Sequence, residues 1–531
     1  GYNAADQLVS LTGSDGVDLT FAWDGNLLRR TIWSGLVAGS VEKRYDHLLR
    51  LKEQVTMGQS VQYAYDADDL LTQVGPVAIG RDPANGRVVS TTVGGVTETF
   101  GYNAFGELET QEAKYGGTPL LRRDYARDAL GRITSVTESV LGSAPATTSY
   151  TYDAAGRLDG VLSGAGAVTY GYDPNGNRTH VSGVPIATYD AQDRLLTYAG
   201  ATYTYTTGGD LRTKTDASGT TTYTYDLQGN LKRVDLPTGD VLEYLVDAQS
   251  RRVALKLNGA FTHKWVYEDQ LRPVAELDGA GNLVSVFVYS TQNPGGAPDA
   301  ILRGGITYRV IKDHLGSPRV IVNEASGSTI QRMDFDAWGS VLVDTNPGWQ
   351  PFGFAGGLWE ASGGLVRFGA RDYSTVTGRW LTRDRVRFRA SRNQYDYAAN
   401  NPTNQVDPSG YTPWTPYPAF PLPVVWCLFL SPNPSDCFGT PSPPPQPDSP
   451  NVDLDAQPFP TPSPAPCARP PRNPLRDCLS TCTREFSDAS CYPTGPAKGN
   501  TVRPDEECVK AKDSARFACY NECKQAFPPS R

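Results

Sequence analysis

Tyr152-Asp-Ala-Ala-Gly-Arg-Leu158 is the stretch that decides the fold, because its Tyr-Asp pair and its glycine recur along the chain. A second full copy is Tyr172-Asp-Pro-Asn-Gly-Asn-Arg178. The anchor tyrosines that follow lie 16 to 23 residues apart, at positions 152, 172, 189, 205, 225, 244 and 267. A period of this size is typical of a repeat architecture in which each copy is one supersecondary unit.

One copy of the motif predicts one β-hairpin. Residues 147–152 alternate and are rich in β-branched and aromatic side chains, which favours a strand. Asp153 and Gly156 supply turn chemistry, since aspartate hydrogen-bonds the backbone two residues on and glycine accepts a positive φ. Residues 157–162 return as the second strand. A single hairpin cannot bury its apolar face, so we expect stacked hairpins to form a long sheet.

Composition excludes several classes of protein. The formal net charge of −8 argues against nucleic acid as a general partner. The chain has no run of 18 apolar residues, so we expect no transmembrane segment. Asp173-x-Asn175-x-Asn177 is similar to part of a calcium loop but lacks the downstream glutamate, so we expect no metal and no cofactor. The chain starts at Gly1 inside a repeat, which favours a C-terminal fragment of a longer protein.

Cysteine usage divides the chain. Residues 1–426 contain no cysteine, whereas the last 105 residues contain all nine. Proline is also concentrated there, with 26 of the 41 prolines in residues 412–531. We therefore predict a repeat array in residues 1–300, a denser domain in 301–411, a Pro-rich linker in 412–474 and a Cys-rich domain in 475–531.

The Cys-rich domain is predicted to be a small α-helical hairpin. Two Cys-x-x-x-Cys pairs have the i, i+4 spacing that places both thiols on one helix face. A module of this size needs covalent staples. The disulfide candidates are Cys478, Cys482, Cys491, Cys508, Cys519 and Cys523. A zinc site is the alternative, although no histidine lies in this region to help.

Three further motifs carry a family resemblance. They are Gly378-Arg-Trp-Leu381, Asn400-Asn-Pro402 and Asp407-Pro-Ser-Gly410, in this order. The region around them resembles the RHS repeat-associated core domain, and the upstream array resembles RHS/YD repeats. The resemblance implies an all-β fold, in which a hollow shell of spiralling YD hairpins (a β-cocoon) is plugged by the core domain. It also implies that the core cuts off a variable C-terminal region, often a polymorphic toxin, which the shell encloses.

The resemblance also implies a catalytic set. Asp384 and Asp407 match an aspartyl-protease-like dyad, with Arg371 as its partner, and the cut is expected between Tyr411 and Thr412. Two carboxylates that share a site cannot both ionise, so one can act as general base on a water while the other acts as general acid.

The sequence departs from the family pattern at two places. Arg385 stands where the family usually has proline, and Tyr411 where it usually has leucine. The alternative role for Asp384 and Asp407 is to cap turns, since Asp-Pro-Ser-Gly is good turn chemistry by itself. The run 367–392 holds eight arginines against two aspartates. We expect it to balance the charge of the shell or the dyad rather than to bind nucleic acid.

Three functions remain open at this stage. The first is a bacterial shell, secreted or at the cell surface, that encloses a toxin and releases residues 412–531 by autoproteolysis. Its partners would be the missing N-terminal part of the shell, its own cargo, an immunity protein and secretion machinery. The second is an uncleaved cell-surface or extracellular YD-repeat adhesion protein that interacts with carbohydrate. The third is an inert wall-associated protein with an inactive core. The four histidines, all upstream of the tail, are expected to be structural residues.

Overall fold

The computed structural model describes residues 1–290, 295–385 and 392–413. The chain divides into two compact units, Gly1–Pro441 and Ser442–Arg531, and every described residue belongs to the first. The predicted Cys-rich hairpin of residues 475–531 and nearly all of the Pro-rich linker lie outside the described residues. The described part is almost entirely β-structure, which confirms the predicted fold class. Within it, no helix has the length and apolar character required to cross a membrane.

The first sheet contains 18 antiparallel strands, in which each strand hydrogen-bonds the next along the chain. These are β1 (Ser10–Leu11), β2 (Val17–Asp24), β3 (Leu27–Gly35), β4 (Gly39–Tyr45), β5 (Leu51–Thr56), β6 (Gln59–Tyr65), β7 (Leu71–Val74), β8 (Val77–Arg81), β9 (Val88–Val93), β10 (Val96–Tyr102), β11 (Leu108–Tyr115), β12 (Thr118–Arg127), β13 (Ile133–Val140), β14 (Ala146–Tyr152), β15 (Leu158–Ser163), β16 (Gly166–Tyr172), β17 (Arg178–Val181) and β18 (Val184–Pro185).

The second sheet contains 16 strands in the same sequential antiparallel order. These are β19 (Ala187–Tyr189), β20 (Leu195–Tyr198), β21 (Ala201–Tyr205), β22 (Leu211–Asp216), β23 (Gly219–Tyr225), β24 (Leu231–Asp235), β25 (Val241–Val246), β26 (Arg252–Leu257), β27 (Ala260–Tyr267), β28 (Pro273–Asp278), β29 (Leu283–Val288), β30 (Ala300–Arg303), β31 (Ile306–Lys312), β32 (Pro318–Asn323), β33 (Thr329–Phe335) and β34 (Val341–Asp344).

A third, four-stranded sheet follows, with two short 3-10 turns around it. Its elements are η1 (Phe354–Gly356), β35 (Leu358–Glu360), β36 (Leu365–Phe368), β37 (Arg371–Ser374), β38 (Arg379–Trp380) and η3 (Ala398–Asn400). We call residues 354–413 the plug segment. Its buried aromatic side chains pack together, and the rings of Tyr373 and Tyr397 lie 4.4 Å apart.

In ten of the repeats the turn is built by an aspartate. Asp153 Oδ1 accepts hydrogen bonds from the backbone N–H groups of Ala155 and Arg157, at 2.9 and 3.0 Å. Its second oxygen, Oδ2, accepts from Arg157 Nε at 2.7 Å, and Gly156 has a φ of +81°. The same pair of backbone bonds recurs at Asp46, Asp66, Asp128, Asp173, Asp190, Asp226, Asp247, Asp313 and Asp336.

In eight repeats the tyrosine ties its turn to the preceding turn. Tyr172 Oη donates to the carbonyl oxygen of Leu158 at 2.6 Å, and the Arg157 guanidinium lies 4.5 Å from the centre of the Tyr172 ring. Equivalent hydroxyl bonds to a backbone carbonyl are made by Tyr45, Tyr65, Tyr102, Tyr152, Tyr189, Tyr267 and Tyr289. A buried carbonyl left without a donor would cost stability, so the tyrosine fixes the spacing of neighbouring hairpins.

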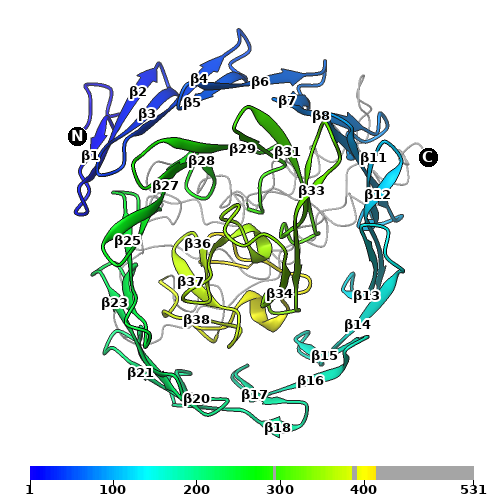
Figure 1. Cartoon of the computed structure of the whole chain (residues 1–531), viewed down its shortest axis with the longest axis vertical. Coiled ribbons are helices and arrows are strands. Elements are labelled where there is room, and N and C mark those ends of the chain that lie inside the picture. Colours follow the sequence, from blue (N-terminus) through cyan, green and yellow to red (C-terminus); the bar gives the residue numbers. More distant parts are fainter. Residues whose placement is uncertain (291–294, 386–391, 414–531) are drawn as a thin grey trace, which may run out of the picture. The chain divides into compact units, whose positions relative to one another are not determined.

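Apolar side chains from strands far apart in sequence form shared clusters. Residues between Leu8 and Val41 pack with residues between Leu245 and Leu358, and Val61–Val93 positions pack with Val288 and Ala300. Figure 1 shows the corresponding blue strands β2–β6 alongside the green strands β27–β31. The plug segment joins a third cluster, because Leu365 and Leu381 pack against buried residues of β20–β25. Figure 1 shows β36, β37 and β38 on the inner side of these repeat strands.

We predict that Asp153→Ala lowers the free energy of unfolding by about 1–3 kcal/mol, because the N–H groups of exposed Ala155 and partly buried Arg157 lose their charged acceptor. Asp153→Asn is the matched control. It keeps the accepting oxygen, as Asn3 and Asn103 do in their own turns, and loses only the half-exposed ion pair with Arg157, worth less than about 1 kcal/mol. Urea unfolding measures both. Equal losses in the two variants would contradict this account of the turn.

Candidate active site

The structure brings Arg371, Asp384 and Asp407 together inside the plug segment. Arg371 opens β37, Asp384 follows β38, and Asp407 follows η3. One nitrogen, Arg371 Nη2, lies 3.0 Å from Asp384 Oδ2 and 3.3 Å from Asp407 Oδ2. The two carboxylate oxygens are therefore no further apart than the sum of these distances. All three side chains are buried, so their charges interact in a medium that screens them little.

Every part of the Arg371 fork is held. Arg371 Nε donates to the carbonyl oxygen of Gly410, and Nη1 donates to that of Gln394 at 3.3 Å. The guanidinium plane lies over the Trp380 ring, 4.2 Å from its centre. A planar cation with several fixed donors suits this position, because it orients two carboxylates and the backbone before the expected cut at once.

Asp407 also contacts the peptide bond that the sequence predicts to be cut. Its Oδ1 accepts from Ser409 Oγ at 3.0 Å and from the backbone nitrogens of Tyr411 and Thr412, each at 3.1 Å. Burial raises the pKa of the Asp407 carboxyl above its ordinary value, against the lowering influence of Arg371 and these hydrogen bonds. A carboxyl oxygen thus lies beside the nitrogen of the Tyr411–Thr412 peptide bond, with a raised tendency to carry a proton.

The residues named by the sequence therefore lie in one place, with the cysteines as the exception. Cys478, Cys482, Cys491, Cys508, Cys519 and Cys523 are outside the described residues. Among the described residues, no group of three or more His, Cys, Asp or Glu side chains is arranged to hold a metal ion. Chemically, the arrangement offers two carboxyl groups, one fixed cation and a nearby amide.

Arg385, which stands where the family usually has proline, contacts the repeat array. Arg385 Nη2 donates to Asn230 Oδ1 at 3.0 Å, and Arg367 Nη2 reaches the same oxygen at 3.3 Å. Asn230 occupies the turn position where Arg157 stands in its own repeat, and it also donates to Asp226. An arginine at residue 230 would place a third cation here, so asparagine suits the site.

Asn177 provides a second docking position of the same kind. Its Oδ1 accepts from Arg379 Nη1 at 2.9 Å and from Asn393 Nδ2 at 2.6 Å. Sequence reasoning missed both docking positions. The available signal was asparagine in place of the turn arginine at residues 177 and 230, although Asn282 holds the same turn position beside Asp278. The arginine run thus serves partly to attach the plug segment to the repeat turns, and residues 386–391 lie outside the described part.

A strained turn precedes Asp407 and is anchored on the repeats. The backbone is left-handed at three successive residues, with φ values of 50° at Ala398, 51° at Ala399 and 59° at Asn400. Residues other than glycine rarely adopt such values. Asn400 Nδ2 donates to the carbonyl oxygen of Gly176 at 2.9 Å. Asn404 Oδ1 accepts from the Ile133 nitrogen at 2.8 Å. Such strain persists only where the surroundings impose it, so the repeats help to determine the course of the chain towards Asp407.

Solved structures with this fold include two Tc toxin assemblies. The crystal structure of the TcdB2-TccC3-Cdc42 complex matches with a TM-score of 0.57 at 15% identity, over 77% of this chain and 24% of that one. The Photorhabdus luminescens Tc holotoxin pore matches with a TM-score of 0.58 at 14% identity, over 80% and 24%. At these identities the likeness concerns the fold.

Curated relatives fall into two groups. Teneurin-4 of Mus musculus is 27% identical over 384 residues, which is 68% of this chain and 13% of that protein. Double-stranded DNA deaminase toxin A of Burkholderia cenocepacia (strain H111) is 29% identical over 406 residues, which is 67% of this chain and 26% of that protein. The chain therefore spans only a small part of either relative.

A family model settles the classification. The model described as Teneurin YD-shell matches residues 2–403, which include the whole repeat array and most of the plug segment. This match confirms the YD-repeat resemblance that the Tyr-Asp motifs indicated. The chain belongs to the Teneurin YD-shell family.

Proposed function

We propose that this protein is a YD-repeat shell that cuts its own backbone between Tyr411 and Thr412 and so releases residues 412–531. The observation that carries the proposal is the position of Asp407. Its Oδ2 shares one arginine nitrogen with Asp384, while its Oδ1 lies 3.1 Å from the nitrogen of Thr412. A turn cap would need only the second of these contacts.

The proposed reaction is hydrolysis of one peptide bond. Asp384 accepts a proton from water as the water oxygen attacks the carbonyl carbon of Tyr411. Once the carbonyl carbon is tetrahedral, the Thr412 nitrogen has a free lone pair and accepts the proton of Asp407, and the carbon–nitrogen bond breaks. The products are a carboxyl group on Tyr411 and an amine on Thr412. Arg371 keeps both carboxyl groups and the Gly410 carbonyl in place during these steps, which lowers the entropic cost of the reaction.

The released piece would consist of the Pro-rich linker, residues 412–474, and the Cys-rich domain, residues 475–531. The array of residues 1–300 and the core of residues 301–411 would form the carrier. The toxin among the relatives supports a secreted bacterial effector carrier. Such a carrier would require the upstream part of the shell, a secretion route and an immunity protein that protects the producing cell.

A second candidate is an uncleaved extracellular adhesion protein, and the teneurin relatives support it. The two candidates differ in one measurable property, the integrity of the chain after folding. In the adhesion protein, Asp384 and Asp407 would only hold the turn around residues 407–412.

We predict that the 57.5 kDa chain runs as two pieces on a denaturing gel, with a new N-terminus at Thr412. Asp384→Asn and Asp407→Asn should each slow the cut by about 100-fold or more, since each removes one proton-transfer group. The matched control Asp190→Asn, in a repeat turn, should be cut normally. Mass spectrometry locates the cut. An unmodified, folded chain that stays intact would refute the proposed protease and favour the adhesion protein.

The raised pKa of Asp407 gives the cut a pH dependence. The neutral form of this carboxyl is the proton donor, so the rate should fall as the pH rises through its folded pKa. On the acid side the rate should also fall, once the ionised base takes up a proton, which gives a bell-shaped profile. The chain can be refolded from urea across a pH series and the cleaved fraction followed with time. A rate that keeps rising up to pH 9 would contradict the role of Asp407 as the acid.

Arg371→Lys tests the shape of the cation separately from its charge. Lysine keeps the charge but cannot reach both carboxyl groups and two backbone carbonyls at once, so we expect cleavage slowed on the order of 100-fold. Arg233→Lys, an exposed arginine paired with Asp235, is the control. Normal cleavage in Arg371→Lys would show that the fork is dispensable.

A further inference from the structure

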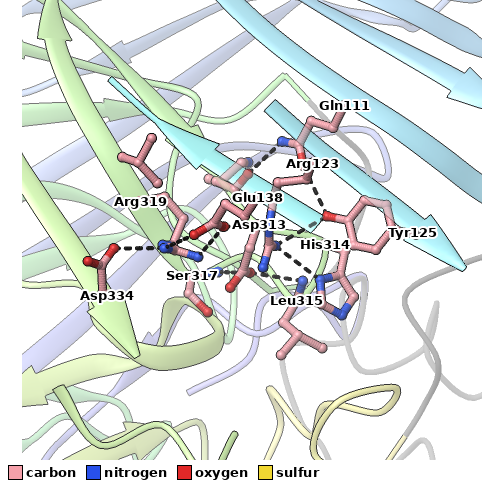
Figure 2. Close-up of polar contacts among 12 residues, drawn as sticks. Gln111, Arg123, Tyr125, Glu138, Asp313, His314, Leu315, Ser317, Arg319 and Asp334 are labelled. Atoms are coloured by element: carbon pink, nitrogen blue, oxygen red, sulfur yellow. Dashed lines mark hydrogen bonds and ion pairs between the residues drawn. The ribbon is translucent and has the colours of Figure 1, made fainter. Parts of the chain in front are cut away.

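One histidine, His314, lies between the repeat array and the plug segment. It belongs to the turn Lys312-Asp-His-Leu-Gly-Ser317 between β31 and β32, where Asp313 Oδ1 accepts from the nitrogens of Leu315 and Ser317 at 3.0 and 2.9 Å. Figure 2 shows the His314 ring beside Arg123 and Tyr125 of β12. The Tyr125 ring meets it edge-on at 5.2 Å. The side chain is thus fixed by its own turn and by a distant strand.

Each ring nitrogen of His314 faces a group that can act only as a hydrogen-bond donor or only as an acceptor. Nδ1 lies 3.3 Å from Arg123 Nη1, and Nε2 lies 2.8 Å from the backbone oxygen of Thr403. An arginine nitrogen can only donate and a carbonyl oxygen can only accept. The ring is therefore neutral, with its proton on Nε2 and a lone pair on Nδ1. A second proton on Nδ1 would face the arginine cation and remove the hydrogen bond from Arg123.

The surroundings of the ring disfavour its charged form. Burial lowers the pKa of His314 to about 4, with a further lowering from Arg123 and Arg127 that Asp313 and the Thr403 carbonyl only partly oppose. Glu138 lies nearby, but it is matched by Arg123 and by Arg319, each at 2.8 Å. The other titratable groups around the same cavity are Tyr150, Asp336 and Arg319, with Tyr125 packed against the ring. The cavity has a volume of about 60 Å³, which is room for a water molecule beside the imidazole.

Thr403 links this histidine to the candidate active site. Its hydroxyl lies 3.0 Å from Tyr152 Oη, and the neighbouring Asn404 donates to the same tyrosine at 2.8 Å. The segment from Asn400 to Asn404 leads directly to Asp407, and the contact with His314 holds it from the side of the second sheet. Tyr152 and Ile133 hold it from the first sheet.

We propose that His314 is a positioning residue, whose neutral imidazole ties the segment 400–404 to the repeat array. A proton on Nδ1 would remove the hydrogen bond from Arg123 and set the ring against that cation, which would displace the ring and with it the Nε2 donor to Thr403. Acid would then loosen the chain that carries Asp407. The tie itself stands independently of proteolysis, whereas its effect on cleavage rests on the function proposed above.

The direction of the pH effect follows from linkage. The folded pKa of about 4 is below the ordinary value of 6.5, so the loosened state binds more protons than the tied state between these values. The stabilisation is complete above pH 6.5 and is lost as the pH falls towards 4. Over this window the equilibrium constant for loosening should rise by up to about tenfold for each pH unit.

Amide hydrogen exchange of the peptide covering residues 398–406 tests the proposal, on the chain blocked by Asp384→Asn and corrected for intrinsic exchange at each pH. In the chain that keeps His314, we expect the amides of residues 398–406 to lose protection by about tenfold for each pH unit between pH 6.5 and 4.5. His314→Gln keeps a donor and an acceptor but cannot be charged, so its protection should stay nearly constant. His263→Gln, a half-exposed histidine beside Glu276, is the matched control and should follow the unmodified chain.

Two outcomes would overturn the proposal. One is an acid-induced loss of protection in His314→Gln equal to that of the control. The other is unchanged protection at pH 7 in His314→Leu, which lacks the donor to Thr403. If the leucine variant does not fold, the glutamine comparison still decides. The cleavage rate of His314→Gln and His314→Leu without the blocking substitution is a separate readout. Normal cleavage in a leucine variant with weakened protection would retain the tie and reject its effect on the active site.

Discussion

The structure depends on the hydrogen bonds that each turn aspartate accepts from two backbone N–H groups, two and four residues further on. They close the turn with a side chain, so the strands on both sides keep their backbone groups for the sheet. In eight repeats the tyrosine before the turn also donates its hydroxyl hydrogen to a backbone carbonyl of the preceding turn, as Tyr172 does. Each repeat therefore specifies its own bend and its distance from its neighbour. Contacts within a repeat and with its neighbour are therefore enough to form a sheet of this length.

The same turns also bind the plug segment. In five of the ten aspartate turns the last turn position carries an arginine that pairs with the turn aspartate, as Arg157, Arg194 and Arg251 do. At residues 177 and 230 the position carries asparagine, whose side-chain carbonyl oxygen accepts from an arginine of the plug segment. In these two turns the arginine comes from the plug segment and not from the repeat. The asparagine still donates to the turn aspartate, so the turn keeps its hydrogen bonds. Docking is thereby directed to two particular turns without a change of fold.

The sequence was sufficient for the repeat architecture and insufficient for its attachments. Hairpins follow from contacts within about 20 residues, which composition and spacing record. Asp384, Asp407 and Arg371 could be brought together only through the family resemblance, since their spacing alone fits turn caps equally well. The partners of Asn230, Asn177 and His314 were beyond reach, because the contacts span 137 residues from Arg367, 202 from Arg379 and 191 from Arg123. Asparagine at the last turn position is a local signal, but it does not show that a distant arginine will meet that turn.

The contacts that attach the plug segment to the repeats would also restrict the proposed self-cleavage to the folded chain. The raised pKa of Asp407 comes from burial, and burial exists only once the segment 400–411 has docked. That docking uses Ile133, Tyr152 and Gly176 of the first sheet and Arg371 of the plug. In a partly folded chain Asp407 would face water and ionise like any exposed aspartate. The proton needed by the leaving amine would then be missing, so the proposed chemistry is restricted to a chain whose repeats have already assembled around the plug.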